Sequence, residues 1–257
     1  MRKGRILSMP YMNWFYISVS FLGIFFVLVL GLNPPHSSGD LPFRKPVIGL
    51  LFVLICTLGA LASLSPKKCS TFPYYGSRSA TIPHDLQRLS KGHHPACKQF
   101  TSHTIVLHGH VICAGCTGLF IGALLSILGA GSYFLLGAEV VNAHLFIVLG
   151  IFGLISGFAQ FAFRGYFRSL MNVFFVLGAL LVLIGEDSLT QNFFIDLSVL
   201  AITLFWILTR IALSKWDHNR VCQRCISIKK GCELLSKSQP ESGGFKIELY
   251  IRLRRRP

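Results

Sequence analysis

Charged residues are scarce in this sequence. They make up 14% of the chain, against about 25% in an average soluble domain. Acidic residues are the rarest, because 10 Asp and Glu stand against 25 Lys and Arg. Hydrophobic residues reach 52%. A soluble globular protein is excluded by this deficit, since its water-facing surface needs more charge.

The chain has instead a series of apolar runs, several of which reach the length of about 20 residues that crosses a bilayer. A single run could be a signal peptide, but these runs recur along the chain. The sequence therefore predicts an all-α fold, a polytopic transmembrane helical bundle of about six spans, located in the cell membrane. The predicted spans are residues 14–32, 46–64, 111–131, 141–163, 169–185 and 193–213. Glu186, Asp187 and Ser188 are interpreted as turn residues between the last two spans.

Positive charge is distributed unevenly around the predicted spans. Of the 25 basic residues, only Arg44 and Lys45 fall in the segments on one side of the bundle. Basic flanks of apolar spans stay in the cytosol. Both termini are therefore predicted to be cytosolic. The outer segments also hold the acidic residues Asp40, Glu139, Glu186 and Asp187.

This topology divides the chain into four parts. Residues 1–64 form a transmembrane helix pair, whose first span is expected to remain as an uncleaved anchor, because its apolar core is longer than that of a signal peptide. Residues 65–110 form a cytosolic Cys/His-rich loop, 111–213 a four-span bundle and 214–257 a basic tail. The expected partners are the bilayer and its anionic headgroups at the cytosolic face, not nucleic acid. No oligomeric state follows from the sequence.

Seven of the eight cysteines are predicted to share the cytosolic side, a reducing compartment in which clustered cysteines more often bind metal or do redox work than form structural disulfides. Two Cys-x-x-Cys pairs, each with the spacing that lets two thiolates chelate one ion, begin at Cys113 and Cys222. Together they could hold zinc or, as an alternative, an iron-sulfur centre. A local set would combine Cys97 and His110 with the first pair, with other histidines of the loop, such as His103, as further donors. The predicted metal ligands are Cys97, Cys113, Cys116, Cys222, Cys225 and His110.

Thiol redox chemistry is the competing hypothesis. Cys113 and Cys116 fall at the start of a predicted helix, where backbone N–H groups and the helix dipole favour thiolate. Such a pair could cycle between dithiol and disulfide in a membrane thiol-disulfide oxidoreductase. A c-type haem attachment is excluded, because Thr117 follows Cys116 where that motif requires histidine.

The segment around these cysteines resembles an uncharacterised family of small prokaryotic multi-span membrane proteins, known as a domain of unknown function. The resemblance covers about 30 residues and departs from the family pattern at Lys98, where the family often has His, and at Gly115, where it often has Arg. It implies a membrane protein with a cysteine-centred site and no established activity. The matching positions are Cys97, Gln99, Cys113, Cys116, Gly118 and Gly122.

Two further patterns lie in the spans. Small residues recur at every fourth position from Ala114 to Ala130, and Gly153 and Gly157 share that spacing, so we expect the third and fourth spans to pack together. Few ionisable groups are expected at mid-membrane, where charge is costly and survives only for function. Transport is therefore the third functional hypothesis.

Overall fold

The computed structural model describes residues 11–35, 42–64, 103–107 and 110–237; the side chains of 107, 110, 111, 218, 219 and 222–237 are outside this description. Its contacts divide the chain into two units, Met1–Asp217 and His218–Pro257. The packing and the sites described below belong to the first unit.

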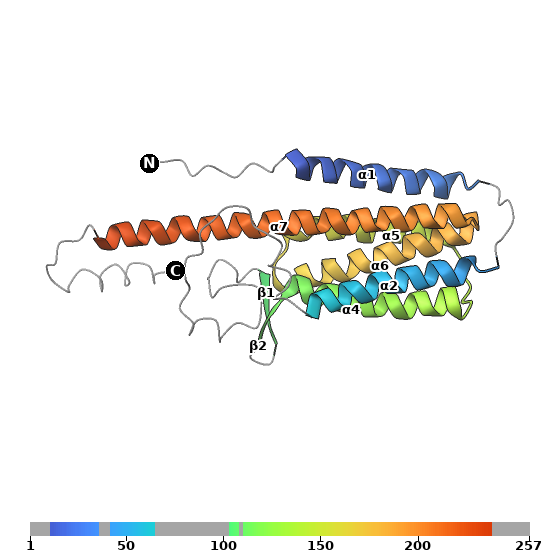
Figure 1. The fold of residues 1–257 in the computed structure, drawn as a ribbon, viewed down its shortest axis with the longest axis horizontal. Coiled ribbons are helices and arrows are strands. Elements are labelled where there is room, and N and C mark those ends of the chain that lie inside the picture. Colours follow the sequence, from blue (N-terminus) through green and yellow to red (C-terminus); the bar gives the residue numbers. More distant parts are fainter. Residues whose placement is uncertain (1–10, 36–41, 65–102, 108–109, 238–257) are drawn as a thin grey trace. The chain divides into compact units, whose positions relative to one another are not determined.

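Within the described residues, six helices are long and apolar enough to cross a membrane, as the sequence predicted (Figure 1). Two of these spans change their helix type at the end. The span of α4 continues into the wider π-helix η3, and the span of α5 continues into the tighter 3₁₀-helix η4. The elements are α1 (Tyr11–Leu32), α2 (Arg44–Leu64), α4 (Ala114–Ala130), η3 (Gly131–Leu135), α5 (Ala143–Phe158), η4 (Ala159–Ala162), α6 (Gly165–Thr190) and α7 (Phe193–Lys237).

The prediction for the turn between the last two spans was wrong. Glu186, Asp187 and Ser188 lie inside α6, which ends only at Thr190. The chain then reverses at Gln191, whose backbone is left-handed with φ 47°. Asn192 follows, and its Oδ1 accepts hydrogen bonds from the N–H groups of Phe194 and Ile195, which caps the start of α7. The two acidic residues are therefore held in a helix and not in a loop.

A small hairpin departs from the all-α prediction. Strands β1 (Thr104–Leu107) and β2 (His110–Cys113) pair antiparallel, with Thr104 opposite Cys113 and Leu107 opposite His110. β2 leads without a break into α4, and Cys113 is both its last residue and the N-cap position of the helix. The hairpin thus replaces the first three residues of the predicted third span.

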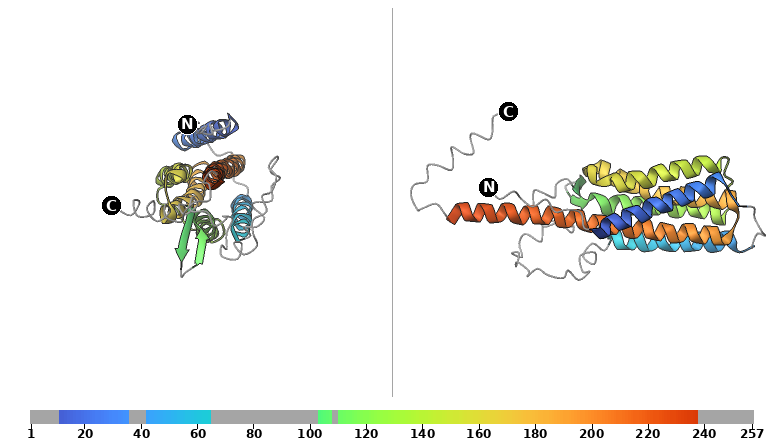
Figure 2. Two further views of the ribbon diagram at one scale, coloured as in Figure 1. Left: turned by 90° about the vertical axis from the view of Figure 1, so that its left-hand side faces the viewer. Right: turned by 90° about the horizontal axis from the view of Figure 1, so that it is seen from above.

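The small residues of α4 and of α5 both pack against helix α6. A Cβ on Gly118 or Gly122 of α4 would lie within 3.1 Å of atoms of α6, and the same holds for Gly153 and Gly157 of α5. The small residues do bring helices close, as predicted. The partner was predicted wrongly, because both stripes pack on α6 and not on each other. The views of Figure 2 show these helices running alongside one another.

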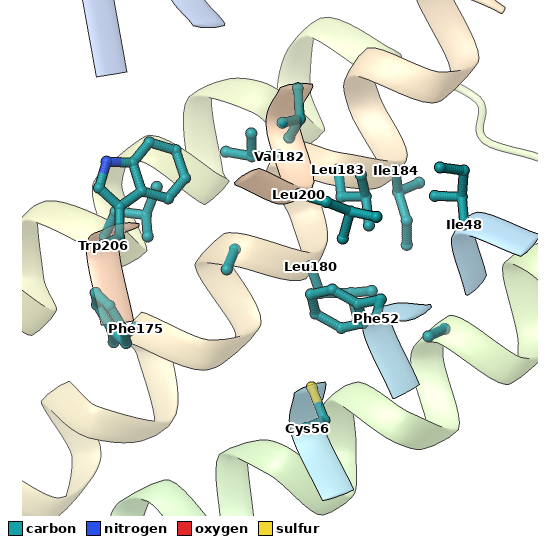
Figure 3. Close-up of a cluster of buried hydrophobic side chains, with 14 of the residues drawn as sticks. Ile48, Phe52, Cys56, Phe175, Leu180, Val182, Leu183, Ile184, Leu200 and Trp206 are labelled. Atoms are coloured by element: carbon teal, nitrogen blue, oxygen red, sulfur yellow. The ribbon is translucent and has the colours of Figure 1, made fainter. Parts of the chain in front are cut away.

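The core between the helices is apolar and continuous. Figure 3 shows Phe52 of α2, Phe175 and Leu183 of α6, and Leu200 and Trp206 of α7 in one cluster, and all of these side chains are buried. Cys56 belongs to the same cluster, in the packing role expected for an apolar thiol.

Substitution of Gly118 tests the contact between α4 and α6. In Gly118→Ala the new Cβ would lie 2.1 Å from the backbone oxygen of Ser169, so the helices must separate. We expect a loss of about 1–3 kcal/mol in the free energy of unfolding, as for other overpacked sites. Unfolding in detergent measures it. Gly59→Ala is the matched control, since nothing lies within 4 Å of its Cβ position. Equal stability of the two variants would refute the contact.

Candidate functional site

A buried ionic cluster lies where α2, α6 and α7 meet. Arg44, the first residue of α2, is only 2% exposed. Its Nη1 donates to Asp187 Oδ1 of α6 and, at 2.7 Å, to Asp196 Oδ2 of α7. Both aspartates are fully buried. One guanidinium group therefore joins α2 to the consecutive helices α6 and α7, which lie more than a hundred residues further along the chain.

Tyr133 of η3 and Lys45 of α2 complete this cluster. The hydroxyl of Tyr133 donates to Asp187 Oδ2 at 2.7 Å. The ammonium group of Lys45 lies 4.9 Å from the centre of the Tyr133 ring, within the range of a cation–π contact. Asp187 thus accepts hydrogen bonds on both of its oxygens, which is how a buried carboxylate is normally stabilised.

Glu186, next to Asp187 on α6, is bound differently. Its side chain is fully buried, and neither of its carboxylate oxygens has a hydrogen-bond partner among the described residues. Apolar groups lie beside it, because a Cβ on Gly31 of α1 would lie 3.3 Å from Glu186 Oε1 and 2.8 Å from the Cδ1 atom of Ile147 on α5. An ionised carboxylate in such surroundings loses its hydration without compensation.

The charges in this region do not balance. Three carboxylates are buried here, those of Glu186, Asp187 and Asp196, and one guanidinium, Arg44, pairs with the two aspartates. Adding Lys45 still leaves one carboxylate in excess. Ions taken out of water cost several kcal/mol each unless they are paired and hydrogen-bonded. The arrangement therefore favours the uptake of a proton or another cation by the carboxylates.

A second polar cluster lies at the opposite end of the helices. Asp217 Oδ2 lies 2.9 Å from both His103 Nε2 and Arg168 Nη2. The hydroxyl of Tyr166 donates to the backbone oxygen of Val106 at 3.1 Å. These contacts fasten the β hairpin to α6 and α7. His103, which the sequence suggested as a further metal donor, contacts Asp217 here.

Gly115, in the first turn of α4, lies between the thiol of Cys113 and a buried guanidinium. A Cβ on Gly115 would lie 4.0 Å from Cys113 Sγ and 3.9 Å from Arg210 Nη2 of α7. Asn172 of α6 holds Arg210 in place. The Nε of Arg210 donates to Asn172 Oδ1 at 2.9 Å, and the Nη2 of Arg210 donates to the same oxygen. Cys113 and Cys116 are both partly exposed and present as thiols. A cation near a helix start favours the thiolate form.

The predicted metal ligands are only partly visible in the structure. Cys113 is the N-cap position of α4 and Cys116 lies in its first turn, so both fall at the start of a helix, as predicted. His110 lies in β2, and Cys222 and Cys225 lie on α7 within the second unit, but their side chains are outside the described part of the chain. Cys97 falls outside the described residues altogether. Among the residues with described positions, no three His, Cys, Asp or Glu side chains form a metal-binding group, so the metal site remains a prediction.

Sequence reasoning missed the ionic cluster, although its parts were visible. Arg44 and Lys45 are the only basic residues outside the predicted cytosolic segments, and acidic residues occupy the same predicted outer side. That complementarity of charge was the available signal. Because Glu186 and Asp187 were interpreted as turn residues, they were not expected to lie in a helix, where they are buried.

Removal of Arg44 is expected to destabilise the fold strongly. Arg44→Gln leaves Asp187 and Asp196 buried without their shared cation, so we expect a loss of about 3–5 kcal/mol in the free energy of unfolding. Denaturant unfolding in detergent measures this loss. Lys45→Gln is the control, since Lys45 meets a ring and not a carboxylate. The triple variant Arg44→Gln, Asp187→Asn, Asp196→Asn should regain much of the loss. A loss no greater than that of Lys45→Gln would contradict the role of Arg44.

No family model, curated protein or solved structure matches this chain. The resemblance drawn from the cysteine segment therefore stays a prediction.

Proposed function

We propose that this chain is a multi-pass protein of the cell membrane that binds a proton at Glu186 as part of a proton-coupled transport activity. In this proposal both termini and the Cys/His-rich loop are cytosolic, and the ionic cluster lies toward the outer face. The basic residues support that orientation, since nearly all of them flank the cytosolic ends of the spans.

Glu186 is the observation that carries the proposal. A purely structural role explains Asp187 and Asp196, because Arg44 ties them together. It does not explain Glu186, whose two oxygens have no hydrogen-bond partner in the described part of the chain. Ionisable groups inside membrane spans are costly and usually mark the path of an ion or a proton.

A proton suits this site better than a metal ion. Hard metal cations take six or more oxygen ligands, which must converge from several groups. A proton needs one carboxylate oxygen. Glu186 supplies that oxygen within apolar surroundings, and its neutral form removes the cost of burying a charge. Binding and release of the proton would then change the net charge between α1, α5 and α6, which is the kind of change that can shift helices.

Chemical labelling tests this proposal. Dicyclohexylcarbodiimide is apolar and adds to protonated carboxyl groups in apolar surroundings. We expect it to modify Glu186 in the full-length protein in liposomes, faster at acidic than at alkaline pH, as mass spectrometry of peptides would show. Glu186→Gln should lose the modification and be at least as stable as the wild type, because no buried charge remains.

Glu139 provides the comparison within the same chain, since it is exposed in the segment before α5. It should react mainly with water-soluble carbodiimides. Absence of the modification at Glu186 over the whole pH range, with a correctly folded protein, would disprove the proposal.

The cytosolic cysteines support a second candidate function, the binding of zinc or an iron-sulfur centre in a structural or regulatory role. The observation in its favour is the placement of Cys113 at the N-cap position of α4 and of Cys116 in its first turn, with His110 in the strand that ends at Cys113. A thiol-disulfide oxidoreductase using the same two cysteines is its alternative, favoured by the nearby guanidinium of Arg210.

Metal analysis separates these two alternatives. Protein purified without chelator should contain one equivalent of zinc, or show the absorption of an iron-sulfur cluster, and the double variant Cys113→Ser, Cys116→Ser should lose it. Cys56→Ser is the control, because Cys56 is buried in the apolar core. Metal-free protein with a reversible disulfide between Cys113 and Cys116 would establish the oxidoreductase instead.

A further inference from the structure

We infer that the outer half of α1 is a movable cover over Glu186, hinged at a polar contact in the middle of the helix. This inference concerns the regulation of the proposed proton site and rests on it. It explains how a carboxylate that is sealed on every side could exchange its proton with water.

The seal is formed at Gly31, one residue before the end of α1. A Cβ at this position would lie 3.3 Å from Glu186 Oε1 and would collide with Ile147, at 2.8 Å from its Cδ1. Glycine therefore lets the backbone of α1 close directly over the carboxylate. Glu186 lies about one helical turn from the end of α6, so only this end of α1 has to move for water to reach it.

The hinge is a polar contact between α1 and α7. Ser20 Oγ lies 2.8 Å from Thr209 Oγ1, and Trp206 Nε1 donates to the backbone oxygen of Ser20 at 3.1 Å. Thr209 also reaches the backbone oxygen of Tyr16 at 3.4 Å. Gly23 continues the close approach, since its Cβ would lie 2.8 Å from Ile202. This region fixes the inner half of α1.

The outer half of α1 is held differently. Among the described residues, no side-chain hydrogen bond joins the segment after Gly23 to another helix; its buried positions are Ile24, Val27 and Gly31, all apolar. From Gly23 to Gly31 the helix rises about 12 Å. Of the six spans, α1 also has the smallest buried share. Apolar contacts without hydrogen bonds can separate and re-form without leaving polar groups unpaired, so this half can pivot on the hinge.

Two matched disulfide locks test the cover. The outer lock is Gly31→Cys with Ile147→Cys, where the Cβ position of residue 31 lies 3.8 Å from Ile147 Cγ2. The hinge lock is Ser20→Cys with Thr209→Cys, whose oxygens are 2.8 Å apart in the wild type. Modification of Glu186 by a water-soluble, charged carbodiimide is followed in full-length protein in liposomes, before and after reduction of each disulfide.

The outer lock should slow this modification by about tenfold or more, and reduction should restore it, because an opening equilibrium of that size is ordinary for a mobile segment. The hinge lock should leave the rate unchanged. Gly31→Ala provides a second variant: its Cβ pushes α1 away from Ile147, so the modification should be faster than in the wild type.

The outcomes separate this inference from the proposed function. If the apolar carbodiimide fails to modify Glu186 in the unlocked protein, the proton site itself is disproved. A second outcome is that the apolar carbodiimide modifies Glu186, and the charged carbodiimide modifies it at the same rate before and after reduction of the outer disulfide. This outcome disproves the cover and leaves the proton site intact. An equal loss of reaction with the hinge lock would show that α1 moves as a whole, which also overturns the inference.

Discussion

The cost of burying charge in an apolar bundle is the constraint on which this structure depends. Asp187 and Asp196 can be fully buried because Arg44 donates to both, and this shared cation joins α2, α6 and α7 at one end. The same constraint makes Glu186 unusual, since it is just as buried but has no such donor in the described part of the chain. Burying such a group costs free energy, and among the described residues Glu186 forms no ion pair that would join helices in return. Its presence is therefore best explained by an ion or proton that it binds.

Helix α6 connects the two ends of the bundle. Glu186 and Asp187 lie near its C-terminal end, and Arg168 and Asn172 lie near its other end, where they contact Asp217 and Arg210 of α7. Close packing of glycines from α4 and α5 on its surface keeps it rigid between these sites. A change in charge at Glu186 would therefore act on helices that are firmly packed on one side and, at α1, loosely held on the other.

The cysteine segment and the ionic cluster lie at opposite ends of the helices, so their chemistry is separate. Cys113 and Cys116 lie at the start of α4 beside the hairpin, and Arg210 of α7 lies near the intervening Gly115. The carboxylates lie at the other end of this span, beside η3. Among the described residues, Tyr133 is the residue of η3 that donates a hydrogen bond to them. Metal or redox work at one end and proton binding at the other are compatible within one protein.

The sequence by itself determined the number of apolar helices, the charge asymmetry and the placement of two thiols at the start of one helix, because these follow from local composition and spacing. It could not determine which helices the small residues bring together: the stripes from Ala114 to Ala130 and at Gly153 and Gly157 specify a close approach but no partner, and the tertiary structure chose α6 for both. Nor could it determine the fate of Glu186 and Asp187. Whether an acidic pair after an apolar run ends a helix or stays within it depends on a cation from a distant segment, and only the folded chain brings Arg44 to Asp187 while leaving Glu186 against the backbone of Gly31.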